Sequence, residues 1–218
     1  MELTNEEKKI LMGISFNPEG VEDGDLLDND LVLLDQMRSV ASYLKEKYPS
    51  YNFEITGCEP KSGTTRDYDE WFFKAKEVDR ASAFIASIEG EAGKFQIRDD
   101  FFGEIVKASI EKEVSQILSD GGFDVVEVNV SFWEQLGKEY GEGISPDEVL
   151  KGEIAAENDI KVFIDGSKLT DSQYEKTVGD MEDCLKKEKV CGEVYVVILS
   201  SRDGDFAKDR LYSDGFAL

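Results

Sequence analysis

Apolar residues in the first half of the chain follow a helical period and then a strand period. Between residues 33 and 48 they recur at spacings of three and four, which predicts an amphipathic helix that ends before Pro49. Four short apolar segments separated by turn residues follow. This order predicts an antiparallel meander with the helix across one face. The helix presents Leu33, Met37, Val40, Leu44 and Tyr48, and the expected strands are 51–56, 71–76, 84–88 and 95–97.

The amino-terminal segment predicts one short helix and then a loop. Thr4 and Glu7 have the spacing of a capping box, in which each side chain accepts a hydrogen bond from the other residue's backbone amide. Gly13 and Pro18 limit the length of this helix. Residues 19–30 are acidic and contain glycine, so we expect them to form a loop.

The second half alternates between the two periods. Helices are expected over 105–118, which Gly121-Gly122 ends, and from the caps at Ser145 and Thr170. Strands are expected over 124–132, 160–164 and 194–199. The first of these strands places Val126, Val128, Val130 and Phe132 on one side, and the last is apolar on both faces, as a central covered strand is.

The predicted fold class is α+β throughout. Residues 1–104 form the helix and four-stranded antiparallel meander, and residues 105–218 form a second half of alternating helices and strands. The change near residue 104 is a change of pattern without a linker. Two packed subdomains and one continuous sheet across the boundary both remain open.

The composition excludes several classes of catalytic and metal site. The 218 residues contain no histidine, 25 Lys and Arg, and 48 Asp and Glu, which gives a net charge of −23. Histidine is the commonest metal ligand and acid–base catalyst, so Ser-His-Asp hydrolysis, Cys-His hydrolysis and His-ligated metals are excluded. With 40% hydrophobic and 11% aromatic residues, the chain has enough apolar side chains to form a core.

The charge also restricts the partners. Nucleic acids and anionic membrane surfaces repel a protein with this surplus, whereas a basic protein is permitted. No apolar stretch approaches the roughly 20 residues of a membrane span. Taken as given, the chain is expected to be cytoplasmic, or exported or lipid-anchored if an N-terminal signal has been removed. The oligomeric state stays open.

Metal and cofactor patterns fail on spacing. Asp23, Asp25, Asp28 and Asp30 supply oxygen ligands suited to calcium, but Val32 stands where an EF-hand needs a fifth-position ligand. Asp203-Gly204-Asp205 fails in the same way and is expected to be a turn. We predict no cofactor, because neither nucleotide-binding glycine pattern is present and the glycine-rich segment 137–143 is acidic.

Three further groups of residues could form a catalytic or recognition site, but a structural role is the favoured interpretation of each. Asp99-Asp100 is the nearest approach to a catalytic pair, but neighbours in a strand face opposite ways, so a turn and helix approach is expected. Cys58 precedes Glu59, which raises a thiol pKa, and Cys184 and Cys191 are free thiols or a local pair. Trp71-Phe72-Phe73 is expected in the core rather than in a recognition patch.

One segment is similar to a known group of proteins. Tyr43-Leu44-Lys45-Glu46-Lys47-Tyr48-Pro49, followed by Phe53-Glu54-Ile55-Thr56-Gly57-Cys58, resembles small uncharacterised α+β proteins and lipoproteins of Gram-positive bacteria. Asp99 to Gly103 fits the same style of domain. The resemblance covers residues 33–105. It implies a helix against a curved antiparallel sheet, as in cystatin-like or NTF2-like folds, and it implies no activity.

Three functions follow from these observations. The favoured hypothesis is a non-catalytic acidic binding or structural module, because each catalytic and cofactor pattern fails. A second is an acidic inhibitor or immunity-type protein that masks a basic surface through electrostatic attraction. The third is a His-free carboxylate-dependent hydrolase, which a pocket lined by two close acids, one of them buried, would favour.

Overall fold

The chain forms two compact units, which we call unit 1 and unit 2. The computed structural model describes residues 2–218. Unit 1 comprises the chain up to Phe102 together with Gln135–Gly143, and unit 2 comprises Gly103–Glu134 and Ile144–Leu218. The sequence places 135–143 in the second half. The structure assigns this segment to unit 1, where the backbone of Leu136 exchanges two hydrogen bonds with Asp99.

Unit 1 begins with two short helices. Helix α1 (Asn5–Ile14) has the expected capping box between Thr4 and Glu7. Helix α2 (Pro18–Asp23) lies in the segment that we expected to be a loop, so that prediction was wrong. The side chain of Asn17 accepts a hydrogen bond from Gly20 N–H, and proline occupies the start of the helix. These local contacts make a helix of one turn and a half possible despite the acidic composition.

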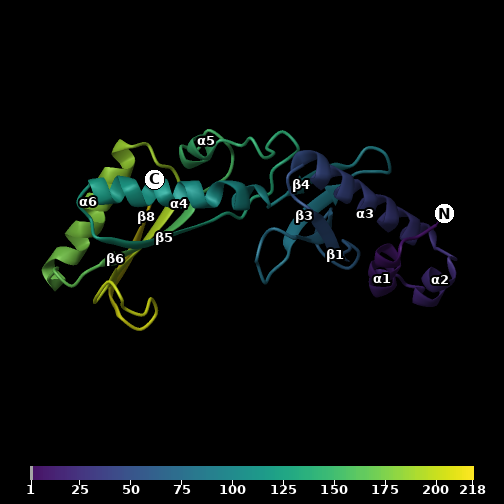
Figure 1. Cartoon of the computed structure of the whole chain (residues 1–218), viewed down its shortest axis with the longest axis horizontal. Coiled ribbons are helices and arrows are strands. Elements are labelled where there is room, and N and C mark those ends of the chain that lie inside the picture. The colour runs from purple at the N-terminus through teal and green to yellow at the C-terminus, as the bar shows by residue number, and fades with distance from the viewer. Residues whose placement is uncertain (1) are drawn as a thin grey trace. The chain divides into compact units, whose positions relative to one another are not determined.

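The rest of unit 1 is a long helix across a four-stranded sheet, as predicted. Helix α3 (Asp28–Lys47) precedes β1 (Phe53–Glu59), β2 (Asp69–Ala75), β3 (Phe84–Glu89) and β4 (Gln96–Asp99). The strands pair antiparallel in the order β1-β2-β3-β4. Figure 1 shows α3 along this sheet, with α1 and α2 near the amino-terminal end of the helix.

The core of unit 1 lies between α3 and the sheet. Trp71 and Phe73 of β2 are buried, which confirms these two aromatic residues in the core, whereas Phe72 points to the other face and is half-buried. Leu33, Met37, Val40, Leu44 and Tyr48 are all buried, which confirms the helical register. Leu44→Ala would therefore remove a fully buried side chain. Phe101, two residues after the end of β4, contacts the rings of several neighbouring aromatic residues.

Unit 2 alternates helices and strands, as predicted. Helix α4 (Phe102–Asp120) leads to β5 (Val125–Ser131), α5 (Pro146–Leu150) and β6 (Asp159–Asp165). A 3₁₀ turn, η1 (Asp171–Gln173), precedes α6 (Tyr174–Lys187), β7 (Glu193–Leu199) and β8 (Arg210–Ala217). The sheet order is β5-β6-β7-β8, with β6 and β7 parallel and the other pairs antiparallel.

Two features of this sheet differ from the prediction. Strand β8 was not expected, because its residues are mostly polar and exposed. In β5 a bulge between Val125 and Glu127 moves Val126 away from the side of Val128 and packs it against the cluster of Phe163 and Val197. A bulge inserts one extra residue and so reverses the alternation of faces.

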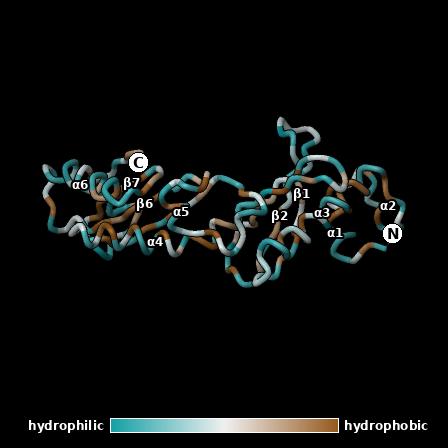
Figure 2. Tube along the Cα trace, turned by 90° about the horizontal axis from the view of Figure 1, so that it is seen from above, coloured by the Kyte–Doolittle hydropathy of each residue, from teal (hydrophilic) through white to brown (hydrophobic). Residues whose placement is uncertain are grey.

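Strand β7 is the covered central strand that the sequence predicts. It lies between β6 and β8, and Val196 to Leu199 are buried on both faces. In Figure 2 the hydrophobic colour follows β6 and β7. No helix within residues 2–218 combines the length and the apolar character needed to cross a membrane.

Candidate functional site

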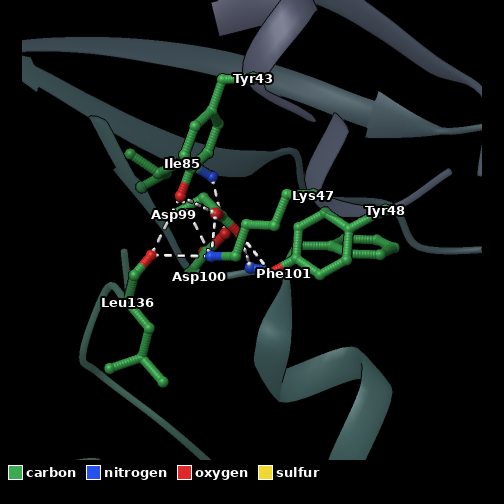
Figure 3. Close-up of polar contacts among 8 residues, drawn as sticks. All are labelled: Tyr43, Lys47, Tyr48, Ile85, Asp99, Asp100, Phe101 and Leu136. Carbon is green, nitrogen blue, oxygen red and sulfur yellow. Dashed lines mark hydrogen bonds and ion pairs between the residues drawn. The ribbon is translucent and has the colours of Figure 1, made fainter. Parts of the chain in front are cut away.

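A buried ion pair joins α3 to the end of β4 in unit 1. Lys47 Nζ lies 2.6 Å from Asp99 Oδ2, and neither side chain is exposed to solvent. Tyr43 and Lys47 are four residues apart on α3 and so share one face of the helix. Asp99 is on the same face of β4 as Ile97, two residues earlier, and that face is turned towards α3. Figure 3 shows these side chains converging on one carboxylate.

Every strong hydrogen-bonding group of this ion pair has a partner. Asp99 Oδ2 accepts from Tyr43 Oη at 2.8 Å as well as from Lys47, and Oδ1 accepts from Tyr48 Oη and from the backbone N–H of Phe101, each at 2.9 Å. Lys47 Nζ also donates to the carbonyl of Leu136 at 2.8 Å. The cluster therefore ties the segment 135–137 to the sheet. A buried charge is tolerated when it is paired and fully hydrogen-bonded in this way.

Burial and the carboxylate together set the protonation of these groups. Burial lowers the pKa of Lys47, and the charge of Asp99 opposes that shift. Burial raises the pKa of both Tyr43 and Tyr48, and the neighbouring Asp99 charge raises each further. Both tyrosines are therefore neutral donors near neutral pH. The cluster contributes structure, since no solvent-exposed carboxylate or amine remains in it for chemistry.

Asp100, the second member of the acidic pair, faces away from the cluster. Its Oδ1 accepts a hydrogen bond from the backbone N–H of Ile85 at 2.9 Å. Burial raises the pKa of Asp100 to about 6, although the Ile85 bond and the charge of Arg80 oppose the shift. The prediction that the two neighbours point in opposite directions and form a turn before a helix agrees with these contacts.

The stability of unit 1 is expected to fall as the pH rises from about 4 to about 6, and Asp100→Asn is expected to remove this loss. The folded protein binds the Asp100 proton more tightly than the unfolded chain does. This binding stabilises the fold fully below the ordinary pKa of an aspartate, and the stabilisation is lost as the pH rises through about 6. One pKa unit corresponds to about 1.4 kcal/mol, so the variant should gain about 1–3 kcal/mol over the wild type at pH 7 and little at pH 4.

Urea unfolding measures this difference in a Trp133→Phe background, where Trp71 of unit 1 is the remaining tryptophan. Asparagine keeps the oxygen that accepts the Ile85 N–H. Parallel stability profiles for the two proteins between pH 4 and pH 7 would contradict the prediction.

An open groove of about 580 Å³ lies beside the buried cluster, within unit 1. Strand β4 and the residue before it supply Ile97 and Phe95, and α3 supplies Ser39 and Ser42. Tyr43, whose hydroxyl belongs to the cluster, also lines the groove. The other lining residues are Glu46, Gln96, Arg98, Gly137, Lys138 and Glu139. This volume is within the usual range of about 300–1,000 Å³ for protein binding sites.

The charges around the groove are balanced and exposed. Glu46 forms an ion pair with Lys138 across it. Arg98 and Glu139 form no ion pair with any residue in 2–218 and remain available to a ligand. The groove thus combines the apolar side chains of Phe95 and Ile97 with a lining that is otherwise mostly polar.

The acidic segment near α2 does not assemble a metal site. Asp23 ends α2 and Asp28 begins α3, while Asp30 is buried and accepts a hydrogen bond from the backbone N–H of Leu27. Asp25 lies in the connection between the helices. Within residues 2–218 no group of three or more cysteine, aspartate or glutamate side chains could hold a metal ion.

The remaining candidates have structural positions. Asp205 Oδ1 accepts from the N–H groups of Ala207 and Lys208, so the segment around it is the expected turn. Burial raises the pKa of the Cys58 thiol, which disfavours the thiolate. Cys184 and Cys191 are free thiols and do not pair with each other.

Sequence reasoning missed most of the groove. The sequence of residues 137–139 predicts only a glycine-rich loop. In the structure these residues form a turn that is one wall of the groove. Ser39 and Ser42 carry no motif. The one signal was the spacing of Tyr43 and Lys47 on the predicted helix, since a lysine four residues from a tyrosine on a buried face needs a buried anion.

The comparisons with known proteins assign no family. No family model and no curated protein matches the chain. Among solved structures, the chain is similar to a DUF5037 family protein from Ruminococcus gnavus, with 14% sequence identity and a TM-score of 0.38. The match covers 76% of this chain and 75% of that chain. Similarity of this degree defines neither a function nor a site.

Proposed function

We propose that the chain is a non-catalytic acidic binding module whose partner is a basic protein, and that the groove of unit 1 is its binding site. The observation that carries the proposal is the groove itself. It is lined by the half-buried Ile97 and Phe95, between a helix face that carries two serines and a turn. Apolar side chains surrounded by polar ones are typical of protein interfaces.

The charge distribution supports a basic partner. The 48 acidic residues divide equally between the two units, so unit 1 attracts cations as a whole although the groove itself is balanced. Long-range attraction of this kind accelerates encounter, while contacts in the groove select the partner. An inhibitor or immunity-type protein that masks a basic surface is one form of such a module.

The hydrolase alternative has less support. It needs two close acids in a pocket, one of them buried. The acids that line the groove, Glu46 and Glu139, are both exposed. The buried Asp99 does not line the groove, and its two carboxylate oxygens already accept four hydrogen bonds.

The fold supports a finer proposal for unit 1. A helix followed by a sequential four-stranded antiparallel meander is the arrangement of cystatin-like proteins, and α3 with β1 to β4 has this order. We extend the proposal to a cystatin-like unit related to the small Gram-positive bacterial proteins that residues 33–105 resemble.

Filling the groove is expected to weaken partner binding. Ser42 lines it, so Ser42→Trp should lower affinity for a basic protein roughly tenfold or more, which corresponds to about 1.4 kcal/mol. Ala41→Trp is the matched control, because Ala41 is exposed on the same helix and does not line the groove. Interferometry against a panel of purified proteins with high isoelectric points measures both variants.

The salt dependence of the affinity is the second part of this test. Raising the salt concentration from 0.1 M to 1 M shortens the Debye length from about 10 Å to about 3 Å, so affinity should fall sharply. Absence of binding across the panel, or equal binding by wild type and Ser42→Trp, would overturn the proposed function.

A further inference from the structure

The outer edge of β4 carries unused backbone hydrogen-bonding groups. Asp100 N–H donates to the Ile85 carbonyl of β3, whereas Asp99 exchanges both of its backbone hydrogen bonds with Leu136 on the other side. Backbone groups of an antiparallel strand alternate between its two sides. The N–H and C=O of Ile97, two residues before Asp99, therefore point away from β3 and into the groove.

The chain itself begins to extend the sheet here and then stops. Leu136 pairs antiparallel with Asp99, so continued pairing would place Lys138 opposite Ile97. Instead Tyr140 N–H donates to the carbonyl of Gly137 in a turn, and Lys138 reaches across to Glu46. The groove is the space that a fifth strand would occupy. The segment that could have filled it turns away.

The helix above this space leaves room for side chains. Ser39 and Ser42 are three residues apart on α3 and share one face, which lines the groove. Side chains of a strand point alternately to its two faces, so every second side chain of an added strand would lie under these small residues and against Tyr43 and Ile97.

We propose that the occupant of the groove is an extended segment of the basic partner protein, which adds antiparallel to β4 as a fifth strand. This inference rests on the proposed function and specifies its mode of recognition. Main-chain hydrogen bonds to Ile97 supply affinity, and an apolar side chain beneath Ser39 and Ser42 supplies selectivity. Basic residues beside that apolar position match the negative charge of unit 1 and the unpaired Glu139.

A phage-displayed library of short random peptides flanked by lysines tests the proposal on the full chain. Peptides enriched on the wild type should lose at least tenfold in affinity for Ile97→Pro, because proline lacks the N–H that would donate to the added strand. Proline is tolerated at an edge strand where its missing N–H would face away from the sheet. Ile97→Ala is the matched variant. It shortens the side chain, keeps the N–H, and should retain most of the affinity.

Hydrogen exchange at single amides gives an independent measurement. Addition of an enriched peptide should slow exchange of the Ile97 amide, while the Arg98 amide, which faces β3, should change little. If Ser42→Trp abolishes binding but Ile97→Pro does not, the groove binds without strand addition; the inference fails and the proposed function stands. If neither variant affects binding, or if no peptide is enriched, both fail.

A second copy of this chain is the competing occupant. Protection of the Ile97 amide that increases with protein concentration in the absence of peptide would identify edge-to-edge self-association. That result would also overturn the inference.

Discussion

Lys47→Met is expected to destabilise unit 1 by about 3–5 kcal/mol. Methionine approximates the length of lysine but removes the charge, which leaves the Asp99 carboxylate fully buried without its cation. It also removes the hydrogen bond that holds the Leu136 carbonyl, so the segment 135–137 loses one of its attachments. Urea unfolding followed by Trp71 fluorescence in the Trp133→Phe background measures the loss.

Two controls distinguish the loss of the ion pair from a general effect of changing a helix residue. Lys45→Met changes an exposed lysine of the same helix and should alter stability by less than about 0.5 kcal/mol. Lys47→Met combined with Asp99→Asn should cost less than the sum of the single changes, because the double variant contains no uncompensated charge. A loss below about 1 kcal/mol would contradict the prediction.

The fold of unit 1 could be predicted because its elements follow simple periods. The helix face from Leu33 to Leu44 and the aromatic core of β2 place their apolar residues where packing requires them. The errors occurred where another interaction outweighs the pattern. Helix α2 depends on the Asn17 cap, and the face of Val126 depends on a bulge. Strand β8 is held by pairing with β7 rather than by burial of its own side chains.

The site could not be predicted, because its parts are far apart in the sequence. Tyr43 and Lys47 were visible as part of a motif, and Asp99 was singled out as a candidate, but nothing in one sequence shows that they meet. Leu136 comes from a segment that the pattern assigned to the other half. The groove depends on the side of β4 towards which the backbone groups of Ile97 point, and on a turn at 137–139. The residue types at these positions predict neither feature.

Phe101→Ala is the second change with a large expected effect, a loss of about 3–5 kcal/mol from unit 1. Phe101 is fully buried, and its ring centroid lies 4.8–5.0 Å from those of Tyr48, Tyr51, Phe53 and Phe84, in edge-to-face geometry. Truncation removes these contacts and leaves a cavity that the surrounding rings cannot close without abandoning their own packing.

Phe16→Ala is the matched control, because Phe16 is an exposed phenylalanine of the same unit, and it should change stability by less than about 0.5 kcal/mol. Phe101 also positions the ion pair, since its backbone N–H donates to Asp99 Oδ1 and its ring packs on Tyr48, which donates to the same oxygen. Phe101→Ala and Lys47→Met should therefore be non-additive by about 0.5–3 kcal/mol in urea unfolding. Strict additivity would show that the aromatic core and the buried ion pair contribute to stability independently, and that Phe101 does not position the ion pair.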